Sequence, residues 1–226
     1  MSGPAWERSV EVRTAAETHA LAAALGADLE TGDLLILTGE LGAGKTTFTQ
    51  GLGEGLGVRP GIISPTFVLV RIHPNLPEGP RPGGPDLVHV DAYRLESAAE
   101  IDDIDLENTM DSAVTVVEWG RDRVEHLSDS RLEVELHRTR GGAPGAPGAP
   151  GAPAPGAGVP SEAGADRTAA DPAVEPGVLD FDTDDDDEPR TVVIRGFGPR
   201  WAEPPALPGF EATPAEPLPQ TPERNS

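Results

Sequence analysis

Apolar and polar residues follow each other along the first part of the chain with the spacings of strands and helices. Residues 34–37, Leu-Leu-Ile-Leu, are a short continuous apolar run, which is typical of a strand buried on both faces. Further on, Phe48, Leu52 and Leu56 recur at the spacing of one helical face. The pattern therefore predicts a buried strand, a connecting loop and a helix that packs by one side.

Upstream of this unit, the pattern predicts a strand over residues 9–13 and a helix from Thr14 to about Gly26. Thr14 and Glu17 have the spacing of a capping box, in which each residue satisfies a backbone amide at the start of the helix. The helix after the loop is unusual because it contains Gly51, Gly53 and Gly55. Each interior glycine costs about 1 kcal/mol relative to alanine, so tertiary packing must stabilise this helix.

Downstream, five segments have the composition and periodicity of strands, and two other segments are expected to form helices. Ser97 to Glu100 carries a second capping box, and a helix is also expected over residues 120–127. We infer that the last strand pairs with the one before it, so that the long segment between them is an insertion in a hairpin. The five predicted strands are 67–71, 87–91, 114–118, 131–136 and 191–195.

The loop between the first buried strand and its helix carries the clearest motif of the chain. Residues 39–46 read Gly-Glu-Leu-Gly-Ala-Gly-Lys-Thr, an unbroken phosphate-binding P-loop, G-x-x-x-x-G-K-[ST]. Glycines let backbone amides turn toward phosphates, and the N-terminus of the next helix favours the same anion. The alternative is a glycine-rich turn that matches by chance, but the strand and the helix required by the motif are both present. The expected nucleotide-binding residues are Glu40, Leu41, Gly42, Ala43, Gly44, Lys45, Thr46 and Thr47.

Lys45 is the only lysine among the 17 basic residues, and the other sixteen are arginines. A compact ammonium suits the β- and γ-phosphates of a nucleotide, and the Thr46 hydroxyl suits Mg²⁺. The motif therefore predicts a bound nucleotide with Mg²⁺, and it does not by itself distinguish ATP from GTP.

Composition limits how much of the chain can be a folded core. The 226 residues include 27 glycines and 25 prolines, and residues 142–153 are four Gly-Ala-Pro triplets. The segment 141–189 is also rich in acidic residues, so we expect it to be disordered. We expect the same of the proline-rich tail 199–226. The folded P-loop domain should then comprise residues 1–140 and 190–198.

Charge and residue usage exclude several classes of function. The formal net charge of −22 argues against direct binding of nucleic acid or an anionic membrane, because phosphate neutralisation needs clustered basic residues. The absence of cysteine excludes disulfides, thiolate metal sites and cysteine nucleophiles. The sequence has neither the pattern of a signal peptide nor a membrane-spanning run, so a cytoplasmic location is expected.

Two predicted strands end in carboxylates, Asp91 and Glu118. Strand C-termini in a parallel P-loop sheet meet at the nucleotide-binding edge, and Mg²⁺ needs a hard oxygen ligand besides Thr46. A single acid at a strand end is more often a helix cap, but two of them downstream of a P-loop favour a role at the metal for at least one. The spacing does not show which of the two binds the metal directly. Ser64-Pro65-Thr66 has two readings: a proline turn that begins a strand, or a switch-like loop whose Thr66 hydroxyl senses the γ-phosphate.

Missing motifs narrow the kind of P-loop protein. The base-reading Asn-Lys-x-Asp motif of GTPases cannot occur with Lys45 as the only lysine, and the Leu-Ser-Gly-Gly-Gln signature of transporter ATPases is absent. A small-molecule kinase stays possible, because several arginines could clamp a phosphate. These are Arg71, Arg94, Arg121 and Arg123.

Four blocks of sequence form a combination that is more specific than the P-loop alone. They are residues 39–48, Ser64-Pro65-Thr66-Phe67, His89-Val90-Asp91-Ala92-Tyr93-Arg94-Leu95 and Val117-Glu118-Trp119. Together they resemble the TsaE family of bacterial ATPases, which serve in making the threonylcarbamoyl modification of adenosine next to the tRNA anticodon. The resemblance covers about residues 9–138 and the strand 191–195. One departure is Asp102-Asp103-Ile104-Asp105, where the family tends to have a glycine turn.

The resemblance implies an α/β fold of the P-loop NTPase type: a three-layer sandwich with a mixed, mainly parallel sheet and a C-terminal antiparallel hairpin. It implies an ATP-hydrolysing accessory subunit that works with TsaD-like and TsaB-like proteins and meets tRNA only through them. Lys45 would hold phosphates, and Thr46 and Glu118 would ligate Mg²⁺. Asp91 would be an essential carboxylate near the γ-phosphate, and Thr66 would lie in the switch loop.

Tyr93 and Trp119 resemble the family's aromatic residues beside the site, although core packing would explain each equally well. A function of another class stays open. In a nucleotide-gated binding module, the presence of bound ATP would matter and its hydrolysis would not. No arginine finger is identifiable in the sequence, so a partner protein would complete the site.

Overall fold

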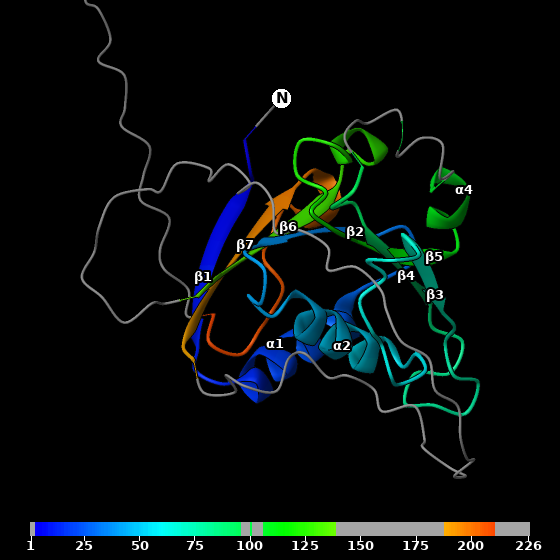
Figure 1. Ribbon diagram of the computed structural model, residues 1–226, viewed down its shortest axis with the longest axis horizontal. Coiled ribbons are helices and arrows are strands. Elements are labelled where there is room, and N and C mark those ends of the chain that lie inside the picture. Colours follow the sequence, from blue (N-terminus) through cyan, green and yellow to red (C-terminus); the bar gives the residue numbers. More distant parts are fainter. Residues whose placement is uncertain (1–2, 96–99, 101–105, 139–187, 211–226) are drawn as a thin grey trace, which may run out of the picture. The chain divides into compact units, whose positions relative to one another are not determined.

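The strand that precedes the P-loop lies at the centre of a sheet (Figure 1). The computed structural model describes residues 3–95, 100, 106–138 and 188–210, which all fall within one unit of the chain. In this described part, seven strands form one sheet in the order β1-β7-β6-β2-β5-β4-β3. The strands are β1 Trp6–Val12, β2 Leu34–Gly39, β3 Val70–His73, β4 Asp86–Asp91, β5 Ala113–Glu118, β6 Arg131–Arg138 and β7 Arg190–Phe197.

The four central strands β6, β2, β5 and β4 are parallel, and the pairs at the two edges are antiparallel. β2 and β5 are apolar and buried along nearly their whole length, as expected for parallel strands covered on both faces. The predicted α/β fold of the P-loop type is confirmed. Parallel central strands place the ends of β2, β4, β5 and β6 along one edge of the sheet, here called the carboxyl edge.

The predicted hairpin is also confirmed, since β6 pairs antiparallel with β7 from Arg131↔Phe197 to Arg138↔Arg190. Residues 139–187 between these strands lie outside the described residues, and with them all but the last two residues of the segment 141–189, for which disorder is predicted. Glu188 is described, and its Oε2 accepts a 2.6 Å hydrogen bond from Arg138 Nε. Most of the short helix predicted from Ser97 also lies outside the described residues.

One face of the sheet is covered by α1, Ala15–Asp28, and α2, Lys45–Leu56, which lie side by side in Figure 1. Thr14 caps α1 as predicted, because its Oγ1 accepts a hydrogen bond from the Glu17 amide at 3.1 Å. Glu17 Oε2 in turn accepts from the Arg13 amide at 2.6 Å, one residue before the cap.

The glycines of α2 have a packing reason. A Cβ on Gly51 would stand 2.8 Å from Ala22 Cβ and closer still to the His19 carbonyl oxygen of α1. A Cβ on Gly55 would likewise meet the Ala23 carbonyl oxygen. The two helices therefore approach backbone to backbone, and this packing compensates for the poor helix propensity of the glycines.

The other face is covered by a thinner layer. Its buried apolar residues come from β2, β4 and β5 and from three non-strand segments: residues 92–95, the single helical turn α4 (Glu107–Met110) with its N-cap, and the segment 120–127. These segments contribute Ala92 and Leu95, Leu106 and Met110, and Val124, respectively.

Three predictions were wrong in detail. The strand predicted over 67–71 begins only at Val70, because residues 66–69 form a turn in which Leu69 has a φ of 65°. The helix predicted over 120–127 is a series of turns followed by a 3-10 helix at Glu125–Leu127. The tail predicted from residue 199 begins with an ordered segment, in which Trp201 is buried and its carbonyl oxygen accepts a 2.8 Å hydrogen bond from Trp6 Nε1.

Candidate nucleotide site

The P-loop joins β2 to the first residue of α2 and has the backbone of an anion cradle. Gly42 and Gly44 have φ angles of 75° and 96°, in the left-handed region that glycine adopts without strain. Gly44 is the N-cap of α2, so the unpaired amides at the start of this helix face the loop. Glu40 and Leu41 are exposed at the loop tip, Ala43 is buried, and Thr46 and Thr47 are half-buried in the first helical turn.

Lys45 is folded back across the opening of the loop. Its Nζ donates hydrogen bonds of 3.0 Å to the carbonyl oxygens of Gly39 and Glu40, and it lies 4.2 Å from the centre of the Trp119 ring. The side chain is largely buried. The ammonium is thus held at the mouth of the cradle, where it can exchange weak carbonyl contacts for a phosphate.

Asp91 and Glu118 end the neighbouring strands β4 and β5 and are register partners in the parallel ladder. Each residue is only 3% exposed. Asp91 accepts hydrogen bonds on both oxygens, from Thr66 Oγ1 at 2.6 Å and from the Tyr93 amide at 2.9 Å. The structure therefore brings both predicted carboxylates to the carboxyl edge beside the P-loop, and it brings Thr66 to one of them.

Glu118 has a partner that the sequence analysis missed. Its Oε1 lies 2.8 Å from Nε2 of His89, a fully buried residue of β4. The His89 ring also lies 6.3 Å from that of His73, and burial, together with the charge of His89, lowers the pKa of His73 to about 4. A buried histidine two residues before Asp91 in an apolar run was the available signal, because such a group requires a partner.

The turn that contains Thr66 connects the loop region to β4. Ser64 Oγ lies 2.8 Å from Thr66 Oγ1, and the Asp91 amide donates a 2.9 Å hydrogen bond to the Leu69 carbonyl oxygen. Phe67, inside this turn, is 86% exposed. The segment is therefore tied to Asp91 by polar contacts, and of its apolar side chains Leu69 packs partly buried against the core while Phe67 does not.

Tyr93 and Trp119 lie beside the site. Their ring centres are 5.4 Å apart, and Tyr93 is 63% exposed, so it is not a core residue. Two arginines considered as phosphate clamps are engaged elsewhere: Arg121 forms a 3.0 Å ion pair with Glu135, and Arg123 Nη1 donates to the Ala92 carbonyl oxygen at 2.6 Å.

The donors present fit a nucleotide with magnesium better than a metal held by protein alone. Among the described residues, no group of three or more histidine or acidic side chains converges on one point. Thr46 and the buried Glu118 would offer oxygen atoms to Mg²⁺, an ion that commonly keeps several waters and binds substrate phosphates as well.

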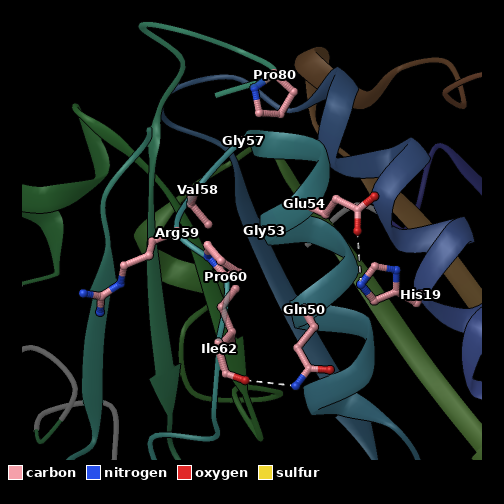
Figure 2. A pocket seen from close by; sticks show the side chains of 11 residues that line it. His19, Gln50, Gly53, Glu54, Gly57, Val58, Arg59, Pro60, Ile62 and Pro80 are labelled. Carbon is pink, nitrogen blue, oxygen red and sulfur yellow. Dashed lines mark hydrogen bonds and ion pairs between the residues drawn. The ribbon is translucent and has the colours of Figure 1, made fainter. Parts of the chain in front are cut away.

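A cavity of about 330 Å³ lies on the flank of α2, away from the residues predicted for the site (Figure 2). No residue of the P-loop, and neither Asp91 nor Glu118, lines it. Gln50 Nε2 spans one side through a 2.9 Å hydrogen bond to the Ile62 carbonyl oxygen, and His19 and Glu54 meet at the other side at 3.6 Å.

A family model, described as threonylcarbamoyl adenosine biosynthesis protein TsaE, matches residues 12–143, which is more than half of the chain. The chain belongs to the TsaE family. The TsaE protein of Streptomyces coelicolor is 54% identical over 114 residues, which are 50% of this chain and 74% of that protein. The TsaE protein of Bacillus subtilis is 39% identical over 123 residues, 54% of this chain and 72% of the relative.

A solved structure supports the fold. The crystal structure of YdiB from Bacillus subtilis matches with a TM-score of 0.52 and 24% sequence identity, covering 87% of this chain and 89% of that one. As a TsaE protein, the chain takes part in tRNA threonylcarbamoyladenosine biosynthesis. Within the described residues, none of the helices has the length and apolar composition needed to span a membrane.

Proposed function

We propose that this TsaE protein is a Mg²⁺-dependent ATP hydrolase that serves as an accessory subunit for the threonylcarbamoyl modification next to the tRNA anticodon. The observation that carries the proposal is the arrangement at the carboxyl edge. A P-loop with its lysine stands beside two buried carboxylates on adjacent parallel strands, Asp91 and Glu118. In P-loop enzymes this edge is where phosphates and their metal bind.

Each side chain has a separate role in this proposal. Lys45 neutralises the β- and γ-phosphates. Thr46 and Glu118 would hold Mg²⁺, which when bound would supply positive charge to the phosphates. His89 keeps the Glu118 carboxylate in one orientation through the 2.8 Å contact. Asp91 orients the attacking water, and Thr66 couples Asp91 to the switch-like turn.

Partner proteins complete the site. Three large apolar side chains around it are strongly exposed, Leu41 at 88%, Phe67 at 86% and Tyr93 at 63%. Exposed apolar residues that gather around a functional site are typical of a surface that another protein covers. TsaD-like and TsaB-like proteins are the proposed partners, and tRNA is met only through them, because a net charge of −22 disfavours direct contact with RNA.

The test is ATP turnover by the full chain with its TsaD-like and TsaB-like partners. Lys45→Ala and Glu118→Gln should each lower turnover at least about 100-fold, the effect of removing one electrostatic contact to a transition state. Glu133→Gln is the matched control, because Glu133 is an acid of the same sheet that pairs with Arg131. Full turnover in either site variant would refute the assigned roles.

One observation favours the alternative, a nucleotide-gated binding module. Both oxygens of Asp91 already accept hydrogen bonds, from Thr66 Oγ1 and the Tyr93 amide, so the carboxylate has less capacity left to orient an attacking water. Asp91→Ala separates the two functions. If tRNA modification and complex formation persist while hydrolysis is lost, the module is the better description; if modification is lost with hydrolysis, the ATPase proposal stands.

A further inference from the structure

Arg190, the first residue of β7, is a buried arginine that has no direct counter-ion within the described part of the chain. It is 7% exposed, and its Nη1 donates a 3.1 Å hydrogen bond to the Glu188 carbonyl oxygen. Its Nε has no hydrogen-bond partner, and among the described residues no carboxylate forms an ion pair with it. A buried guanidinium without an anion is costly, so this side chain is suited to receive one.

The Arg190 side chain lies against the P-loop. Its Nε and Cδ are 3.6 and 3.7 Å from the point where a Cβ on Gly44 would stand. Arg138, its register partner at the end of β6, has Nη1 3.3 Å from the corresponding point on Gly42. The paired ends of the hairpin thus place two guanidinium groups against the two left-handed glycines of the loop.

The charged groups follow a definite order along the carboxyl edge. The strand order β7-β6-β2-β5-β4 puts Arg190 and Arg138 on one side of the P-loop strand, and Glu118 and Asp91 on the other. A phosphate chain across the loop has two different ends, a terminal phosphate that shares Mg²⁺ and an inner phosphate next to the nucleoside. Glu118 and Asp91 suit the terminal phosphate, because carboxylates bind Mg²⁺. Arg190 and Arg138, on the opposite side of the loop, suit the phosphate next to the nucleoside.

We propose that Arg190, with Arg138 beside it, binds the phosphate nearest the nucleoside in a nucleoside di- or triphosphate held by the loop. This inference rests on the proposed function, because it uses the same nucleotide site, and it adds the hairpin as a second source of ligands. Arg138 is already bonded to Glu188 Oε2 through Nε at 2.6 Å. Arg190 is therefore the principal contact, and its planar fork can bind two phosphate oxygens at once.

The test is calorimetric titration of the full chain with ADP and with ATP, for the wild type, Arg190→Met and Arg131→Met. Methionine keeps most of the apolar stem and removes the charge. Arg190→Met should weaken the binding of ADP and of ATP by the same factor, about 10- to 100-fold, because both nucleotides contain the contacted phosphate. Arg131→Met, at the far end of the same hairpin, should leave both affinities unchanged, since Arg131 pairs with Glu133.

Thermal denaturation distinguishes a phosphate-binding role of Arg190 from a purely structural role. If Arg190 binds phosphate, Arg190→Met should keep the melting temperature of the nucleotide-free protein and reduce the rise on adding ADP. A lower melting temperature with unchanged ADP affinity would overturn the inference, as would a loss confined to ATP, which would place the contact at the terminal phosphate. A wild type that binds neither nucleotide would refute the proposed function itself.

Discussion

Replacing Gly51 by alanine should destabilise the protein, although alanine is the better helix former. The substitution gains about 1 kcal/mol of intrinsic helix propensity. The new Cβ, however, would stand 2.8 Å from Ala22 Cβ and nearer to the His19 carbonyl oxygen, whereas real Cβ atoms almost never make contacts under 3.0 Å. Overpacking costs about 1–3 kcal/mol, and the upper end applies here because the obstacle is backbone that cannot rotate away.

The net loss should therefore be as much as about 2 kcal/mol in the free energy of unfolding, or several degrees in melting temperature. Gly53→Ala is the matched control on the same helix, since its Cβ would meet side chains, Ile62 Cδ1 and, at 3.1 Å, Val58 Cγ2, and no backbone atom. The Ile62 side chain borders the cavity in Figure 2, whereas the obstacle to a Cβ on Gly51 is backbone. Urea denaturation of both variants decides: equal stability of the two, or a more stable Gly51→Ala, would refute the backbone-to-backbone packing.

Two further predictions concern buried and paired carboxylates. His89→Leu leaves Glu118 without its hydrogen-bond partner, which should cost about 1–3 kcal/mol in urea denaturation and raise the Mg²⁺ concentration needed for half-maximal ATP turnover. Arg121, with Arg195, lowers the pKa of Glu135 from 4.5 to about 2, so the pairing stabilises the folded state above pH 4.5 and is lost as the pH falls toward 2. Glu135→Gln should thus lower the melting temperature at pH 7, and the difference from wild type should close at acidic pH; a difference that is independent of pH would contradict it.

The central part of the site could be predicted because its signals are local. The P-loop is contiguous in sequence, and apolar runs that end in Asp91 and Glu118 predict neighbouring carboxylates once the strands are known to be parallel. The ladder places the two residues directly opposite each other. By contrast, the approach of Arg190 to Gly44 joins residues separated by more than 140 positions, and no periodicity in either segment predicts it.

Two of the wrong predictions of secondary structure concern segments whose apolar residues pack on the core without forming a long helix or a strand. Trp201 stands among prolines and glycines, yet it packs on β1 through the hydrogen bond from Trp6. The segment 120–127 has a helix-like composition, but Asp122 has a φ of 63°, which ends any helix there. A lone tryptophan in a low-complexity segment was the one available sign of order.

The failed strand at residues 67–71 shows why the site departs from local rules. Had it been straight, Thr66 would lie three residues beyond Leu69, roughly 10 Å past the end of β4. The turn with Leu69 at a φ of 65° instead brings Thr66 Oγ1 to 2.6 Å from Asp91. Trp119, directly after Glu118, is likewise left-handed with a φ of 61°. Each such residue costs about 1–3 kcal/mol, and both adjoin a candidate carboxylate, so backbone strain marks this site as clearly as the glycine motif does.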